Sequence, residues 1–292
     1  MKELWSKEQE IKFFTEARKF ATPAQLFYLG ADNRYYAYWP KSYRGTKSTL
    51  QARSTLIGSY TEKWTTDLLS GFASSRGWHV VKGAVCSEIG LSDRSPADVA
   101  ICKTENINQK PEDIFLIIEV KMSVVWNWEL KIDSTDERLV CLGDYRTHQG
   151  NPGLLRSDTM LKATGKSINI RVSDLRASKI PIIVLGNTPI TEYYYHKTDY
   201  LQRSGIIQGF WSVNPKPLDN NGENIKTTEG LGFYRFDTYG ELLGKLDELF
   251  VEEREFFSSM RTKDELGKFI EIANKETTYG KKAEKFLTLI RG

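Results

Sequence analysis

Apolar side chains recur at helical spacing in several stretches of the chain. Residues 6–19 place them on one side of a short amphipathic helix. A longer helix is predicted over about 48–75, because apolar residues again recur every three or four positions and Gly77 follows as a stop signal. Further helices are predicted over 154–170, about 198–205, 240–260 and 263–290.

After residue 77 the spacing of apolar residues changes from helical to strand-like. Residues 78–86 and 97–102 are predicted strands, and the cluster Ser92-Asp-Arg-Ser-Pro96 between them predicts a turn. Residues 114–122 begin with an apolar run on both faces, which is typical of a central strand covered on both sides. A fourth strand is predicted over 180–186, where Pro181 indicates a late start or an edge position.

This order of elements predicts an α/β (α+β) fold. We expect a central mixed sheet of four to five strands, flanked by helices and extended by helical additions at both ends. Residues 133–152 and 215–232 are predicted loops. The whole chain, 1–292, is treated as a single domain with a core at about 50–187 and additions at 1–49 and 188–292.

Composition narrows the class of protein. Apolar residues make up 40% and charged residues 27% of the chain, which is ordinary for a soluble globular protein. Three irregularly spaced cysteines do not describe a disulfide framework or a zinc site, and Cys86 and Cys102 are expected to be buried free thiols. The charged N-terminus lacks a signal peptide and no stretch is apolar enough to span a membrane, so we expect a cytoplasmic protein.

One strand carries charges where its pattern predicts burial. Five apolar residues precede Glu119-Val-Lys121, and alternation places Glu119 and Lys121 on the same face. If this strand pairs with the one before it, Asp98 lies beside Glu119. Buried charges are costly unless they are paired or bind a metal, and hard carboxylate oxygens suit Mg²⁺. The alternative is a purely structural salt bridge between Glu119 and Lys121.

These residues resemble the PD-(D/E)xK nuclease superfamily, in particular its type II restriction endonucleases. The match consists of Pro96-Ala-Asp98, a loop and Glu119-Val-Lys121, with one residue between the proline and the aspartate. Glu62 on the preceding helix corresponds to a glutamate of the family. The order of helix, three strands, helix and strand also corresponds, and the resemblance spans about residues 50–187.

Glu-x-Lys occurs twice more in the chain. Glu10-Ile-Lys12 falls in a predicted surface helix, where we expect ordinary solvated charges. Glu129-Leu-Lys131 lies beyond the apolar run and is a weaker candidate. Only Glu119 combines a central strand with a preceding strand that bears an aspartate.

The resemblance implies a Mg²⁺-dependent enzyme that hydrolyses phosphodiester bonds of double-stranded DNA and leaves 5′-phosphate ends. Asp98, Glu119 and the carbonyl of Val120 would hold the metal, with no other small-molecule cofactor. Lys121 would orient the attacking water, and it would act as a base only if its pKa were depressed. Glu62 would support the metal site, and Glu88 would border it. A palindromic target would require a homodimer.

DNA contacts are expected from basic residues outside the core motif. Between residues 34 and 53 five basic residues alternate with aromatic ones and no acid occurs, which fits either a nucleic-acid surface or a solvated loop. Two further regions, a predicted loop and the start of a predicted helix, contribute the rest. The candidates are Lys41, Arg44, Lys47, Arg138, Arg146, His148, Arg156 and Lys162.

Two alternatives remain open from the sequence. One is a repair or mobile-element nuclease of the same superfamily. The other is a DNA-binding protein that keeps the fold and does not cut. Leucines and a phenylalanine at 242–250 would either mediate dimerisation or cap the core.

Overall fold

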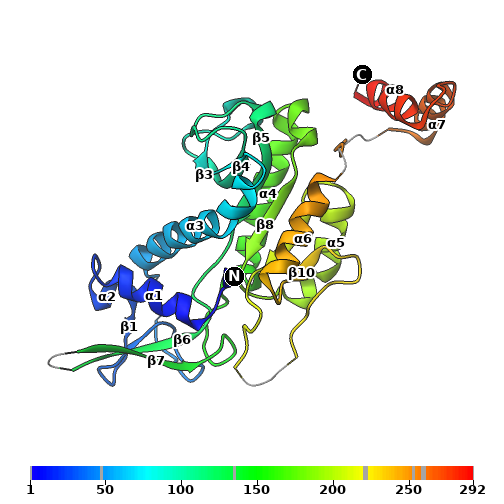
Figure 1. Cartoon of the computed structure of the whole chain (residues 1–292). Coiled ribbons are helices and arrows are strands. Elements are labelled where there is room, and N and C mark those ends of the chain that lie inside the picture. Colours follow the sequence, from blue (N-terminus) through cyan, green and yellow to red (C-terminus); the bar gives the residue numbers. More distant parts are fainter. Residues whose placement is uncertain are drawn as a thin grey trace. The chain divides into compact units, whose positions relative to one another are not determined.

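The structure is a computed structural model that describes residues 2–46, 49–133, 136–219, 223–251, 254–257 and 261–291. The chain divides into two compact units, Met1–Glu253 and Arg254–Gly292, where the sequence pattern was treated as a single domain. Helices and strands are labelled in Figure 1. The first unit holds both sheets and the predicted functional residues.

The main sheet of the first unit is mixed and has six strands in the order β10-β9-β8-β5-β4-β3. Strands β3, β4 and β5 are antiparallel neighbours, whereas β5, β8, β9 and β10 run parallel. The expected mixed sheet is therefore present, and the prediction of four to five strands was too small. The strands are β3 (His79–Ala84), β4 (Ala97–Cys102), β5 (Ile114–Val120), β8 (Ile182–Gly186), β9 (Gly209–Ser212) and β10 (Phe233–Arg235).

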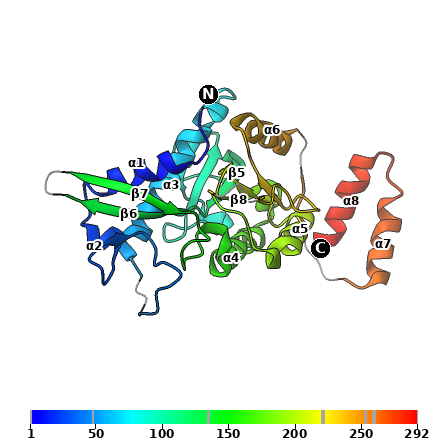
Figure 2. The ribbon, with the colours of Figure 1, turned by 90° about the horizontal axis from the view of Figure 1, so that it is seen from below.

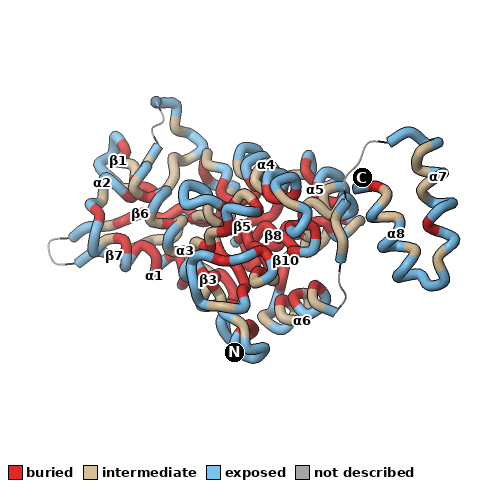
Figure 3. Tube along the Cα trace, turned by 90° about the horizontal axis from the view of Figure 1, so that it is seen from above, coloured by how far each residue is buried: buried red, intermediate tan, exposed pale blue. Residues whose placement is uncertain are grey.

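Alternating residues of this sheet pack against helices on opposite faces. Ile118 and Val120 join the core formed with α1 (Lys7–Ala17), α3 (Gln51–Ser74) and α6 (Tyr239–Phe250). On the other face, Ile117 and Val184 belong to cores that include residues of α4 (Ser157–Ser173). The buried residues of Figure 3 follow these strands. Helices therefore cover both faces, as the continuous apolar pattern of β5 predicts.

A second, antiparallel sheet was not expected. Its order is β1-β2-β6-β7, and the hairpin of β6 and β7 lies beside α1 (Figure 2). The predicted loop at 133–152 was wrong where β7 lies. The β7 side chains are all exposed or half-buried, and its sequence does not alternate between apolar and polar residues. The strand therefore lacks the pattern that would have predicted it. The strands are β1 (Tyr28–Leu29), β2 (Tyr35–Tyr36), β6 (Asn127–Ile132) and β7 (Glu137–Gly143).

The structure decides between the alternatives for two elements at the C-terminal side of the core. Strand β8 begins directly after Pro181, which is the late start that the sequence offered as one of two possibilities, and it lies between β5 and β9 instead of at an edge. The proline fits because its carbonyl accepts from the amide of Ile117 and its missing N–H is outside the strand. Helix α6 buries Leu242, Leu246 and Leu249 in the first unit's core, so these residues cap that core.

The second unit contains two helices, α7 (Lys263–Ala273) and α8 (Tyr279–Arg291). One helix was predicted over 263–290, and the break follows Asn274. Thr262 and Glu265 form a capping box at the start of α7. In the first unit, two shorter helices, α2 (Pro23–Leu26) and α5 (Tyr195–Arg203), complete the structure. Among the described residues, every helix is too short or too polar to cross a membrane.

Candidate functional site

Two neighbouring strands bring the predicted acidic residues together. Strands β4 and β5 pair with Val99 opposite Ile118, so Asp98 lies beside Glu119, as the sequence predicts. The amide of Val120 donates to Asp98 Oδ2 over 2.8 Å and fixes that carboxylate against the strand. Glu119 and Lys121 follow the alternation of β5 and share the sheet face that α4 covers.

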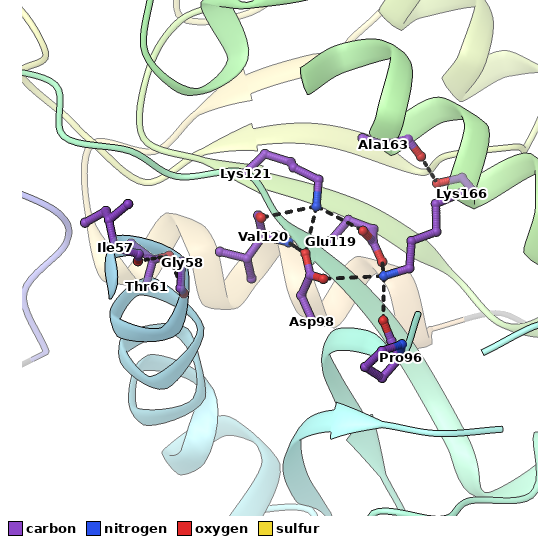
Figure 4. Close-up of polar contacts among 11 residues, drawn as sticks. Ile57, Gly58, Thr61, Pro96, Asp98, Glu119, Val120, Lys121, Ala163 and Lys166 are labelled. Atoms are coloured by element: carbon purple, nitrogen blue, oxygen red, sulfur yellow. Dashed lines mark hydrogen bonds and ion pairs between the residues drawn. The ribbon is translucent and has the colours of Figure 1, made fainter. Parts of the chain in front are cut away.

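Three oxygen atoms converge on the Lys121 ammonium (Figure 4). Lys121 Nζ lies 2.8 Å from Asp98 Oδ2, 3.1 Å from Glu119 Oε2 and 3.3 Å from the Val120 carbonyl oxygen. These are the three residues expected to hold a metal. The structure therefore places a cation, the ammonium group, at the point that their oxygens share.

A second lysine completes the cluster and was not among the predicted site residues. Lys166 of α4 places Nζ 2.6 Å from Glu119 Oε1 and 3.4 Å from Asp98 Oδ1, and it donates to the Pro96 carbonyl over 2.5 Å. One signal was available in the sequence. Lys166 falls on the buried stripe of α4, between Ala163 and Ile170.

Because the cluster is largely buried, the pKa values of its groups depend strongly on the charges beside them. The Glu119 side chain is 0% exposed, and those of Asp98, Lys121 and Lys166 are about one-fifth exposed. Burial and the neighbouring Asp98 raise the pKa of Glu119, while the two lysines oppose that shift. Burial alone would lower the pKa of Lys121, but Asp98 and Glu119 outweigh it and raise that pKa. Lys121 is thus an ammonium here, which excludes it as a base in this arrangement.

The donor set suits magnesium better than softer metals. Among the described residues, no group of three or more histidine, cysteine, aspartate or glutamate side chains could hold a metal ion. Two carboxylates and one carbonyl are nonetheless sufficient for Mg²⁺, which completes its shell with water and phosphate oxygens. Glu119 Oε1 is buried and has the Lys166 ammonium as its partner at 2.6 Å, so a metal ion would bind this oxygen in place of that ammonium.

Glu62 and Glu88 lie in ion pairs of their own. Glu62 of α3 pairs with Lys82 of β3 at 3.2 Å. Within the described part of the chain, no hydrogen bond or ion pair joins Glu62 to Asp98, Glu119 or Lys121. Glu88 is exposed and pairs with Arg176 at 3.2 Å. The cluster is therefore built from two strands and α4, and neither glutamate belongs to its contacts.

The candidate DNA-binding residues differ in accessibility. His148 is buried: its Nε2 lies 3.2 Å from the Val125 carbonyl, its Nδ1 accepts from the Gly150 amide, and its ring stacks on Tyr38. That position does not suit contact with DNA. Lys47 lies outside the described residues. The other six, Lys41, Arg44, Arg138, Arg146, Arg156 and Lys162, are exposed.

The expectation for Glu10 was wrong. Its side chain is fully buried, and its carboxylate accepts from four N–H groups. The donors are the amides of Val125 and Trp126 and the indoles of Trp5 and Trp128. The sequence held a signal for this too, since Glu10 falls on the buried stripe of α1 with Phe13, Phe14 and Ala17.

Glu129, in the third Glu-x-Lys tripeptide, is also buried. It accepts from Arg34 Nε over 2.7 Å and forms a salt bridge with the same guanidinium. Its position on β6 places it in the second sheet, away from the β4–β5 pair.

Comparisons of the chain with protein-family models, with curated proteins and with solved structures find no match.

Proposed function

We propose that this protein is a Mg²⁺-dependent endodeoxyribonuclease of the restriction type, which hydrolyses double-stranded DNA at specific sites and leaves 5′-phosphate ends. The observation that carries the proposal is the convergence of Asp98, Glu119 and the Val120 carbonyl on one cation, the ammonium of Lys121. Here both lysines contact both carboxylates in a site that keeps partial access to solvent.

Asp98, Glu119 and the Val120 carbonyl would hold the metal ion. When bound, a magnesium ion would polarise the scissile phosphate and lower the pKa of a nearby water. Lys121 would leave its present position and, still protonated, donate hydrogen bonds to the attacking water and the phosphate. Lys166, whose ammonium contacts both carboxylates, would give up part of these contacts to the metal ion.

The chain immediately after Lys121 is held rigidly, which supports a functional arrangement. The amide of Lys121 donates to the Leu185 carbonyl over 2.7 Å. The side chain of Asn187, itself buried, exchanges two hydrogen bonds with the backbone of Ser123. Glu10 then accepts from the amides at 125 and 126. Catalytic groups need such fixed support, because small displacements cost rate.

Sequence recognition and dimerisation belong to the same proposal. Arg138 on the β6–β7 hairpin and Arg44 in the N-terminal segment are exposed, and such long basic side chains would contact a DNA groove. A homodimer would read a palindromic site with one such set from each copy.

The test is digestion of unmethylated phage DNA in Mg²⁺ by the wild type and by the variants Glu119→Gln and Lys121→Ala. We expect discrete fragments from the wild type and a loss of on the order of a thousandfold or more in each variant. Lys12→Ala is the matched control, because Lys12 ends another Glu-x-Lys tripeptide and is exposed. It should cut like the wild type.

The outcomes separate the candidate functions. Smeared or structure-selective products would favour a repair or mobile-element nuclease with the same site. DNA binding without cleavage would favour a binding protein in which the two lysines permanently neutralise the carboxylates. Cleavage that survives both substitutions would show that Glu119 and Lys121 do not form the site.

A further inference from the structure

The second unit, Arg254–Gly292, is too small to be stabilised by its own core. It consists mainly of a hairpin in which α7 and α8 pack against each other (Figure 1). A unit of fewer than about forty residues buries too little apolar surface to stay folded without a disulfide, a metal or a partner. This unit has no cysteine, and its described residues hold no group of three metal-ligating side chains. A partner is therefore the remaining source of stability.

The hairpin leaves most of its apolar side chains in contact with water. Among the described residues of the second unit, only Ala273 and Ile290 are buried. Ile270 is 52% exposed, and Phe257 and Ile272 are 48% and 39% exposed. Contiguous apolar surface of this kind is typical of a face that another molecule covers.

Both helices of the hairpin carry the same apolar pattern, which we call the apolar stripe. Its positions follow the spacing i, i+3, i+4 and i+7, and they are Leu266, Phe269, Ile270 and Ala273 in α7, and Ala283, Phe286, Leu287 and Ile290 in α8. A contact between two helices needs only two apolar positions in seven, whereas three are typical of a helix in a bundle core. Each stripe is therefore wide enough to contact its hairpin neighbour and one further helix.

The charges of the hairpin favour a second copy of the same hairpin as this partner. Helix α7 carries three acidic and two basic residues, whereas α8 carries four basic residues and one acidic residue. When two hairpins pack about a two-fold axis, each helix gains one helix of the other copy as its neighbour. Placing α7 beside the α8 of the other copy brings opposite net charges together, and the two-fold axis repeats this contact.

We propose that the α7–α8 hairpins of two copies of this chain pack together through their apolar stripes as a four-helix bundle. The stripes of both copies form the core of the bundle, and α7 of each copy lies beside α8 of the other. This bundle holds together the homodimer of the proposed function, so its use in reading a palindromic site rests on that function. The physical argument for the bundle does not depend on the candidate site.

The test places a charge on the apolar stripe and, as a matched control, elsewhere on the same hairpin. Ile270→Glu adds a carboxylate at a stripe position that is already half exposed in one copy, so a single hairpin tolerates it. Thr288→Glu adds the same charge at an exposed position of α8 outside the stripe. Both substitutions are made in the full-length chain.

Sedimentation equilibrium without DNA measures the self-association of the three proteins. We expect the wild type and Thr288→Glu to form dimers with dissociation constants that agree within about threefold. Ile270→Glu should raise the dissociation constant by about a hundredfold or more, because the two-fold interface would bury the added charge twice.

A second measurement needs no variant. Hydrogen exchange of the wild type is followed by mass spectrometry at a protein concentration below and one above the dissociation constant. We expect the amides of 263–291 to exchange more slowly at the higher concentration, because the bundle protects both helices.

A wild type that stays monomeric, or a dimer that survives Ile270→Glu, would overturn the proposal. Protection of 263–291 that does not change with protein concentration would also overturn it, because the hairpin would then pack within its own copy. A monomeric wild type that cuts phage DNA into discrete fragments would remove the bundle and leave the nuclease intact. A dimer that Ile270→Glu separates and that does not cut DNA would keep the bundle and remove the nuclease.

Discussion

Two glutamates in this chain have the same burial and opposite surroundings. Glu10 and Glu119 are both 0% exposed, and each begins a Glu-x-Lys tripeptide. Glu10 accepts from four N–H groups that the fold holds in place. Glu119 has ammonium groups and a second carboxylate as neighbours. The motif alone therefore says nothing about role, and the partners of the carboxylate decide it.

The two sets of partners differ in whether they can be exchanged. Backbone amides and packed indoles cannot leave Glu10 without unfolding their segment. Lys121 and Lys166 are long side chains about one-fifth exposed, so their ammonium groups can reach water and give way to another cation. Fixed donors indicate a structural carboxylate, and exchangeable cations indicate a site that accepts a ligand.

The largest expected effect is on stability. Glu10→Ala would leave four donors in the core without an acceptor, so we expect it to lower the free energy of unfolding by about 3–5 kcal/mol. Glu119→Ala should cost roughly 1 kcal/mol, because both lysines can extend into solvent. Urea denaturation of the two variants measures the difference. Equal losses would show that Glu119 is as much a part of the framework as Glu10.

The pH dependence of stability gives the next effect. Burial raises the pKa of Glu10 from 4.5 to about 8, against the hydrogen bonds that lower it. A carboxyl group whose pKa is higher in the folded state stabilises the protein fully below the unfolded value. That contribution is lost as pH rises, here between pH 4.5 and about 8.

We therefore expect the stability of the wild type to fall relative to Glu10→Gln across this range, by up to about 1.4 kcal/mol per pH unit. Denaturation curves of both proteins at several pH values test it, since other titrating groups cancel in the difference. A pH-independent difference would mean that the four donors hold Glu10 ionised throughout.

The parts of the fold that the sequence predicted depend on local patterns. Helices α1, α3 and α4 and strands β4 and β5 follow from the spacing of apolar residues along one segment. Strands β9 and β10 are short, and they exist because Phe210 and Phe233 pair across an intervening loop. No local sequence pattern predicts such pairing, because it depends on packing in the assembled core.

The residues of the site show the same difference between local pattern and tertiary packing. Asp98 and Glu119 lie on strands that are adjacent in both sequence and space, and Lys121 directly follows the second strand, so alternation and pairing were sufficient to predict their contact. Lys166 comes from a helix that packs on the sheet, and its approach to Glu119 depends on that packing. Lys166 and Glu10 nevertheless share one signal, a charged residue on an otherwise buried helical stripe. This signal predicts a buried charge but does not identify the group that pairs with it.

The smallest effect concerns the exchange of cations at Glu119. Lys166→Met removes an ammonium 2.6 Å from Glu119 Oε1 and keeps most of the apolar stem. Less positive charge beside the carboxylates should favour a divalent ion, so we expect Mn²⁺, used as a probe, to bind about tenfold more tightly. Lys162→Met is the control, because Lys162 is one turn away on α4 and its side chain is 78% exposed. Electron paramagnetic resonance of free Mn²⁺ measures both affinities. Weaker binding by Lys166→Met would instead assign Lys166 to holding the ligands in position, and the ammonium groups would then support the metal site instead of competing for it.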